Sequence, residues 1–151
     1  MSVAPGKTIV GFIGLGVMGK SMAGHILDAG YQLHVFTRTR SSADELVGRG
    51  AVWEDTVAAL SEKCNVIITI VGFPKDVEEV YLKDSGILNN ADSGTCVVDM
   101  TTSSPELAKK IFDTARTKNI DSLDAPVSGG DLGARNAALS IMVGGDKAAF
   151  D

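Results

Sequence analysis

The sequence predicts an α/β protein: a doubly wound, mostly parallel sheet with helices on both faces and an antiparallel last strand. Three observations lead to this prediction. Strand-like and helix-like segments alternate along all 151 residues, which is typical of consecutive βαβ units. The run VIITIV at residues 66–71 is apolar on both faces, as a central parallel strand should be. Only about a dozen residues separate the last two predicted strands, which is too few for a comfortable parallel crossover.

Each element follows from a local pattern. Apolar runs predict strands at residues 8–13, 33–36, 51–53, 66–71, 95–100, 120–127 and 139–143. Helical spacing predicts helices at 17–29 and 56–62, from 74 to 81, and after residues 42 and 103. Ser42 with Glu45 and Ser103 with Glu106 have the spacing of a capping box, and Asp55 precedes the helix at 56–62. These side chains are therefore expected to begin their helices.

Composition predicts one soluble globular domain spanning residues 1–151. Hydrophobic residues make up 44% and charged residues 22%, as in ordinary globular domains. The net charge is −5 and basic residues form no run, which argues against a nucleic-acid surface. No stretch approaches 18 consecutive apolar residues, and the N-terminus lacks the apolar core of a secretory signal. Cys64 and Cys96 lack C-x-x-C spacing, which favours reduced thiols, a cytoplasmic location and no metal site.

Three glycines follow the first predicted strand. Gly14, Gly16 and Gly19 fit the pattern G-x-G-x-x-G, with a strand before them and a helix after them. In such a loop the first glycine permits a tight turn, the second lets a pyrophosphate approach the backbone, and the third lets the helix pack closely. Free N–H groups and the dipole at the helix start also favour phosphate. A plain βα turn is the alternative, but the context favours a Rossmann-type dinucleotide site.

The residues at the end of the second predicted strand indicate which dinucleotide the site binds. NAD is selected by an acidic residue about 20 residues after the glycines, whereas this sequence has Thr37, Arg38 and Thr39 there. A guanidinium flanked by hydroxyls suits a 2′-phosphate, and Arg38 could also stack on the adenine. The pattern favours NADP, with NAD possible; a solvated basic turn is the alternative.

Two later segments are more specific: VVDMTTSSPE at residues 97–106 and LDAPVSGGDLGARNAALSIMVGG at residues 123–145. Together with GFIGLGVMGKSMA, they resemble the 3-hydroxyisobutyrate dehydrogenase family, the β-hydroxyacid dehydrogenases, whose N-terminal domain is a 6-phosphogluconate dehydrogenase-like NADP-binding domain. The resemblance runs the length of the chain in family order. The D-A-P-V-S-G-G run is absent from the related imine reductases.

The resemblance implies roles for particular residues. It places Leu15, Val17 and Met18 beside the pyrophosphate, Val71, Gly72, Phe73 and Pro74 under the adenosine ribose, and Thr102 near the nicotinamide. It also places Ser128, Gly129 and Gly130 on the substrate carboxylate, for which a hydroxyl and bare backbone amides are suitable donors. The alternatives are that Thr102 caps the following helix and that the 128–130 segment is a tight turn. His25 and Ala137–Ala138 stand where the family usually has Asn and Gly-Thr.

The family also implies a reaction: reversible hydride transfer between NADP(H) and a small 3-hydroxy acid or its semialdehyde. The family's catalytic lysine belongs to a motif that does not occur here, so we expect it to lie beyond Asp151, with an all-helical domain. This chain is expected to contain no catalytic residue, and to bind cofactor without turnover. The full-length parent is expected to be a homo-oligomer that takes a small carboxylate-bearing substrate.

Two other functions stay open at this stage. One is a nucleotide-binding or interaction module without chemistry, which would lack the lysine throughout. The other is an imine- or ketone-reducing relative, which would not require the carboxylate motif.

Overall fold

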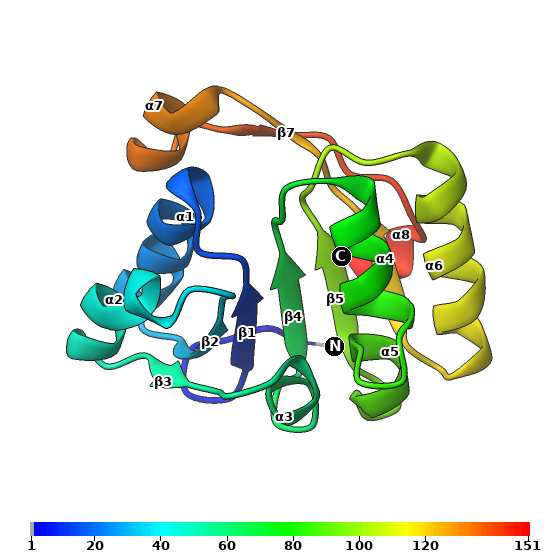
Figure 1. Ribbon diagram of the computed structural model, residues 1–151. Helices are drawn as coiled ribbons and strands as arrows, with labels where there is room; N and C mark the ends of the chain where they lie inside the picture. Colours follow the sequence, from blue (N-terminus) through cyan, green and yellow to red (C-terminus); the bar gives the residue numbers. More distant parts are fainter. Residues whose placement is uncertain (1) are drawn as a thin grey trace.

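A six-stranded parallel sheet forms the centre of the molecule in the computed structural model, which describes residues 2–151 (Figure 1). The strand order is β3-β2-β1-β4-β5-β6, so the chain winds outward from β1 in both directions, as in doubly wound folds. The strands are β1 (Ile9–Ile13), β2 (Gln32–Phe36), β3 (Val52–Trp53), β4 (Val66–Thr69), β5 (Cys96–Asp99) and β6 (Asp121–Asp124). The predicted fold class is confirmed.

Helices cover both faces of this sheet. They are α1 (Val17–Asp28), α2 (Asp44–Gly48) with the 3₁₀ turn η1 (Arg40–Ala43) before it, α3 (Val57–Ser61), α4 (Pro74–Leu82), α5 (Ile87–Asn90), α6 (Pro105–Thr117), α7 (Gly130–Arg135) and α8 (Lys147–Phe150). Two separate apolar cores result: α1, α2 and α7 contribute to one, and α3, α4, α5 and α6 to the other. In β1, Phe12 belongs to the first core and Ile13 to the second, because alternate strand residues point to opposite faces.

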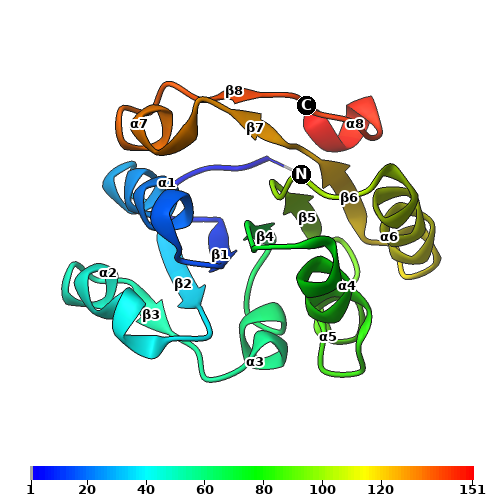
Figure 2. The same ribbon diagram turned by 45° about the horizontal axis from the view of Figure 1, so that its top comes forward.

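The last strand is antiparallel, as predicted, but it is not in the main sheet. The predicted strand at 120–127 is divided: β6 ends at Asp124, and β7 (Val127–Ser128) pairs instead with β8 (Ser140–Ile141) in a two-stranded ribbon. Pro126 lies between β6 and β7, and proline cannot donate a ladder hydrogen bond. Figure 2 shows the ribbon running from α7, beside α1, to α8, beside β6.

The parallel strands end together at one edge of the sheet. The register aligns Phe36, Ile13, Thr69, Asp99 and Asp124, one from each of five neighbouring strands. The segments that follow these five residues therefore emerge at the same edge. In doubly wound folds, ligands bind at this carboxyl edge, where the strand order reverses.

Three predicted helix starts are wrong by one residue or more. Ser42 and Glu45 form no capping box, because the 3₁₀ turn delays α2, whose N-cap is Ala43. The α6 helix is capped by Ser104 rather than Ser103, with Pro105 in the first position, where its fixed φ suits a helix. At α3 the cap is Thr56, whose hydroxyl accepts from the backbone N–H of Ala59 at 3.0 Å.

An ionic cluster of buried His34 and Glu54 with the half-exposed Lys63 ties β2 to the segments after β3 and α3. His34 Nδ1 lies 2.8 Å from Glu54 Oε1, and Lys63 Nζ donates to both carboxylate oxygens of Glu54 at 2.8 and 2.9 Å. Burial alone would raise the pKa of Glu54, but the hydrogen bonds from Lys63 and His34 outweigh it and lower this pKa. The Glu54 carboxylate is thus held ionised in the core.

Cys64 and Cys96 are both buried and not bonded to each other, and burial raises their thiol pKa values to about 12 and about 11. Over residues 2–151, no helix is long and apolar enough to cross a membrane.

Candidate functional site

The three glycines after β1 differ in what surrounds them. Gly14 has φ +99°, and a Cβ there would lie 1.9 Å from the carbonyl oxygen of Ile70. A Cβ at Gly19 would lie 2.0 Å from the carbonyl oxygen of Gly14. A Cβ at Gly16, in contrast, would meet nothing within 4 Å, and its φ of −73° is open to any residue. The protein's own packing explains Gly14 and Gly19, whereas the space beside Gly16 is open.

That space adjoins the start of a long helix. Gly16 is the N-cap of α1, and no side chain caps this end. The first N–H groups of a helix have no partner within the helix, and with the helix dipole they form a site for an anion. The residue types and the geometry therefore fit a pyrophosphate placed against Gly16.

A cleft of about 400 Å³ runs from this loop across the carboxyl edge. Three segments contribute its walls: the glycine loop, the end of β2, and the chain from the end of β4 into α4. Its lining includes predicted site residues from all three, namely Gly14, Leu15, Gly16, Val17, Met18, Gly19, Thr37, Arg38, Val71 and Gly72. Thr39, Phe73, Pro74, Thr102 and the 128–130 segment lie outside this lining.

Arg38 lies at the mouth of the cleft and reaches toward α4. Its side chain is 71% exposed, and Nη2 donates to Asp76 Oδ1 at 2.6 Å and lies 3.8 Å from Glu79 Oε2. Thr37, which precedes it, accepts from the backbone N–H of Leu15 at 3.4 Å, so the end of β2 is tied to the glycine loop. The hydrogen bond from Arg38 lowers the pKa of Asp76. The sequence did not reveal Asp76 as a site residue, because 38 residues separate it from Arg38.

A buried hydrogen-bond chain fixes the loops after β4 and β5. Thr69 Oγ1 donates to Asp99 Oδ1 at 2.9 Å, so the hydroxyl of Tyr81, also 2.9 Å away, must donate to Thr69. Asp99 also accepts from the backbone N–H of Thr101 at 3.1 Å, and the Thr101 hydroxyl accepts from Val71 at 3.0 Å. Burial raises the pKa values of Tyr81 and Asp99. Because its pKa is raised, the Tyr81 phenol stays protonated and remains a hydrogen-bond donor. This series of hydrogen bonds holds the cleft wall at Val71. Thr102, which directly follows Thr101, is exposed.

The predicted carboxylate segment lies where the ribbon meets α7. Ser128 is the last residue of β7 and is exposed, and Gly129 and Gly130 have φ of +134° and +59°, conformations that favour glycine. The α7 helix that follows packs on α1, and His25 Nε2 lies 2.8 Å from the carbonyl oxygen of Ala134. His25 therefore has a structural contact that joins the two helices.

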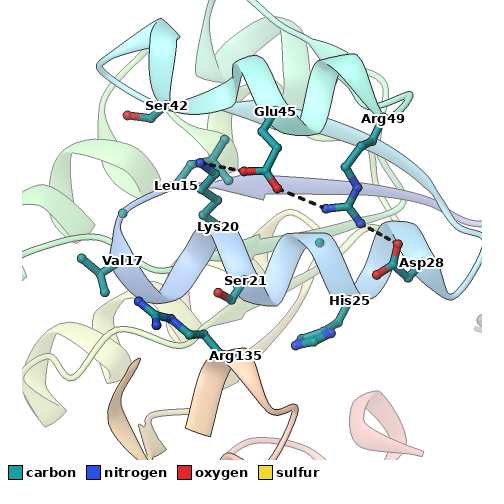
Figure 3. Close-up of a pocket in the computed structure, with 12 residues that line it drawn as sticks. Leu15, Val17, Lys20, Ser21, His25, Asp28, Ser42, Glu45, Arg49 and Arg135 are labelled. Carbon is teal, nitrogen blue, oxygen red and sulfur yellow. Dashed lines mark hydrogen bonds and ion pairs between the residues drawn. The ribbon is translucent and has the colours of Figure 1, made fainter. Parts of the chain in front are cut away.

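A second groove, of about 710 Å³, lies between α1, α2 and α7 and shares residues 15–17 with the cleft (Figure 3). Its charged side chains largely pair with one another: Lys20 with Glu45 at 3.0 Å, and Arg49 with Asp28 at 2.5 Å. This pairing leaves little free charge for a ligand.

The fold and the cleft define the chain as an NAD(P)-binding domain of the Rossmann type. The chain belongs to the family described as the NAD binding domain of 6-phosphogluconate dehydrogenase, whose family model matches residues 9–151. Among residues 2–151, no group of three or more His, Cys, Asp or Glu side chains could hold a metal ion.

The relatives of the chain include proteins named as oxidoreductases. The chain is 57% identical over 145 residues to the uncharacterized oxidoreductase YkwC of Bacillus subtilis, covering 96% of this chain and 50% of that protein. A structure described as Psf3 in complex with NADP+ and 2-OPP has a TM-score of 0.89 and 35% identity, over 93% of this chain and 50% of that one. The 3-hydroxyisobutyrate dehydrogenase of Mycobacterium tuberculosis, solved with L-serine, has a TM-score of 0.88 and 30% identity, over 95% and 48%. The chain thus spans about half the length of the relatives it matches.

Proposed function

We propose that this chain binds NADP(H) across the carboxyl edge of the sheet, with the pyrophosphate against Gly16. The observation that carries the proposal is the contrast among the three glycines. Gly14 and Gly19 are needed by the fold itself, whereas the missing side chain of Gly16 leaves open space beside the uncapped start of α1. A dinucleotide accounts for that space, because its pyrophosphate must approach the backbone closely.

The adenosine half would occupy the cleft between Arg38 and the loop after β4. Arg38 would donate to the 2′-phosphate from one side, while the hydroxyls of Thr37 and Thr39 are further donors on the same segment. Residues 71–74 would pass under the ribose. This arrangement supports a preference for NADP over NAD, and the absence of a carboxylate at the end of β2 agrees with it.

The nicotinamide half would lie toward Thr102 and the β7–α7 turn. We propose that Ser128, Gly129 and Gly130 hold the carboxylate of a small 3-hydroxy acid or its semialdehyde, as the family resemblance implies. The bound nicotinamide would supply or accept the hydride. The residues of this chain would orient the two reactants, which is a large part of catalysis in such enzymes.

The proton of the substrate hydroxyl needs an acid/base group. The resemblance assigns this role to a lysine beyond Asp151, in an all-helical domain, so we propose that residues 1–151 bind the nucleotide and that turnover needs further residues.

The experiment compares NADPH binding, by calorimetry, to the chain and to two matched variants. Gly16→Val should abolish binding without unfolding the domain, since a Cβ at this position meets nothing within 4 Å and the φ of −73° does not require glycine. Gly48→Val is the control, because Gly48 is equally open but lies in α2, away from the cleft. Undiminished affinity in Gly16→Val would contradict the proposed site.

A further inference from the structure

Asp76 is the least exposed charged group near the mouth of the cleft. It stands in the first turn of α4, and its side chain is only 16% exposed, against 71% for Arg38. One carboxylate oxygen, Oδ2, accepts from the backbone N–H of Phe73 at 3.0 Å, and the other accepts from Arg38. A Cβ on Gly72 would lie 3.3 Å from Oδ2. The carboxylate is therefore fixed by backbone on one side and faces the arginine on the other.

This contact determines where the guanidinium lies. Among residues 2–151, Arg38 donates a side-chain hydrogen bond to Asp76 alone. A guanidinium carries five N–H donors, so most of them stay available to a ligand. Asp76 thus orients the exposed side chain of Arg38, which comes from the end of β2, toward α4.

The same carboxylate would also act directly on a phosphate bound by Arg38. A phosphate bound by Arg38 would lie near two carboxylates, Asp76 and, 3.8 Å from the guanidinium, Glu79. Like charges this close weaken binding of the phosphate. Adenosine without the 2′-phosphate would not meet this repulsion. Specificity is a difference of two affinities, and a repulsive group against one ligand changes it as much as an attractive group for the other.

We propose that Asp76 is a specificity-determining residue: by binding Arg38 and placing a negative charge beside it, Asp76 moderates the preference for NADP so that the cleft also accepts NAD. The inference rests on the proposed function, because it assumes that the cleft binds the dinucleotide. It predicts that the charge of Asp76, and not only its hydrogen bonds, controls the ratio of the two affinities.

The test is the ratio of NADPH to NADH affinity, measured by calorimetry on Asp76→Asn. Asparagine has a single acceptor oxygen. Directed at the backbone N–H of Phe73, it keeps the start of α4 and removes the carboxylate charge beside Arg38. NADPH should bind about threefold to tenfold more tightly than in the unmodified chain, and NADH should change by less than about twofold. Glu79→Gln should shift the ratio in the same direction by a smaller factor, and it tests the charge without touching the helix start.

Glu78→Gln is the matched control. Glu78 is on the same helix, but its carboxylate lies 3.7 Å from Lys110 and forms no ion pair with Arg38. The affinity ratio of Glu78→Gln should therefore equal that of the unmodified chain. An unchanged ratio in Asp76→Asn, or equal weakening of both nucleotides, would overturn the inference and leave Asp76 a purely structural residue. Binding of neither nucleotide to the unmodified chain would overturn the proposed function and the inference together.

Discussion

Replacing Ala137 by glycine should stabilise this protein. Ala137 follows the end of α7 with φ +51°, in the left-handed region. Its N–H donates to the carbonyl of Ala134 at 3.4 Å, and the N–H of Ala138 donates to Gly133 at 2.9 Å. These two bonds are those of a Schellman motif, in which glycine is the preferred residue.

The same motif ends three other helices, and none of them uses alanine at this position. Gly30, Gly50 and Asn119 occupy it after α1, α2 and α6. A left-handed conformation costs an L-residue roughly 1–2 kcal/mol, and the greater freedom of glycine in the unfolded chain offsets about 0.4–1 kcal/mol of the gain. The net stabilisation expected for Ala137→Gly is therefore about 0.5–1 kcal/mol. In a domain of this size that raises the Tm by about 1–4 °C.

Thermal and urea unfolding, followed by circular dichroism, would measure the effect. Gly30→Ala is the matched control with the opposite sign: Gly30 has φ +89°, and its nearest neighbour to a new Cβ, in Pro5, is at an ordinary 3.7 Å. This control should lower the Tm through backbone strain alone. A lower or unchanged Tm for Ala137→Gly would show that the left-handed backbone at Ala137 does not destabilise the protein.

Four further outcomes follow from the contacts described above. Tyr81→Phe should lower the free energy of unfolding by about 1 kcal/mol, because it removes the buried hydroxyl and its hydrogen bond to Thr69; an unchanged urea midpoint would contradict this. Glu54→Gln should lower the Tm at neutral pH. The deficit should shrink as the pH falls below the ordinary pKa of 4.5, since a carboxylate with a lowered pKa stabilises the fold above that range and loses its contribution on protonation; a deficit independent of pH would be the contrary result. Arg38→Ala should weaken NADPH binding about tenfold more than NADH binding, or roughly 1.4 kcal/mol, and equal losses would remove Arg38 from the 2′-phosphate site. Ser128→Ala should weaken binding of 3-hydroxyisobutyrate to the chain saturated with NADP+. The matched variant at its register partner, Ser140→Ala, should not do so, and equal behaviour would argue against the carboxylate site.

The sheet and the glycine loop could be predicted because their signals are local. A buried parallel strand is apolar on both faces, and the VIITIV run contains β4, Val66–Thr69. The glycines at 14 and 19 are needed where two backbones nearly touch, and the G-x-G-x-x-G spacing records that need directly. These features require no knowledge of distant parts of the chain.

The helix starts and the last strand depended on information that the sequence does not carry locally. Ser103 and Ser104 are both suitable caps, and only the backbone conformation before Pro105 decides between them. The chain leaves the parallel sheet after Asp124, and Pro126 follows. The next strand, β7, pairs with β8 to form the ribbon. Strand pairing of this kind depends on tertiary contacts, which local patterns cannot specify.

Some residues of the candidate site could likewise be predicted from local sequence, and others could not. Arg38 could be singled out from its position after β2, but its partner Asp76 looked like an ordinary residue in the first turn of a helix. Their contact depends on how α4 lies across the cleft. Likewise, Thr69 and Tyr81 support the loop at Val71 from inside the core, where a sequence shows only a threonine in a strand and a tyrosine in a helix.

The decisive measurement is a side-by-side calorimetric titration of this chain with NADPH and NADH. Both nucleotides should bind at one site per chain, and NADPH should bind more tightly. Binding of neither nucleotide, or tighter binding of NADH, would contradict it.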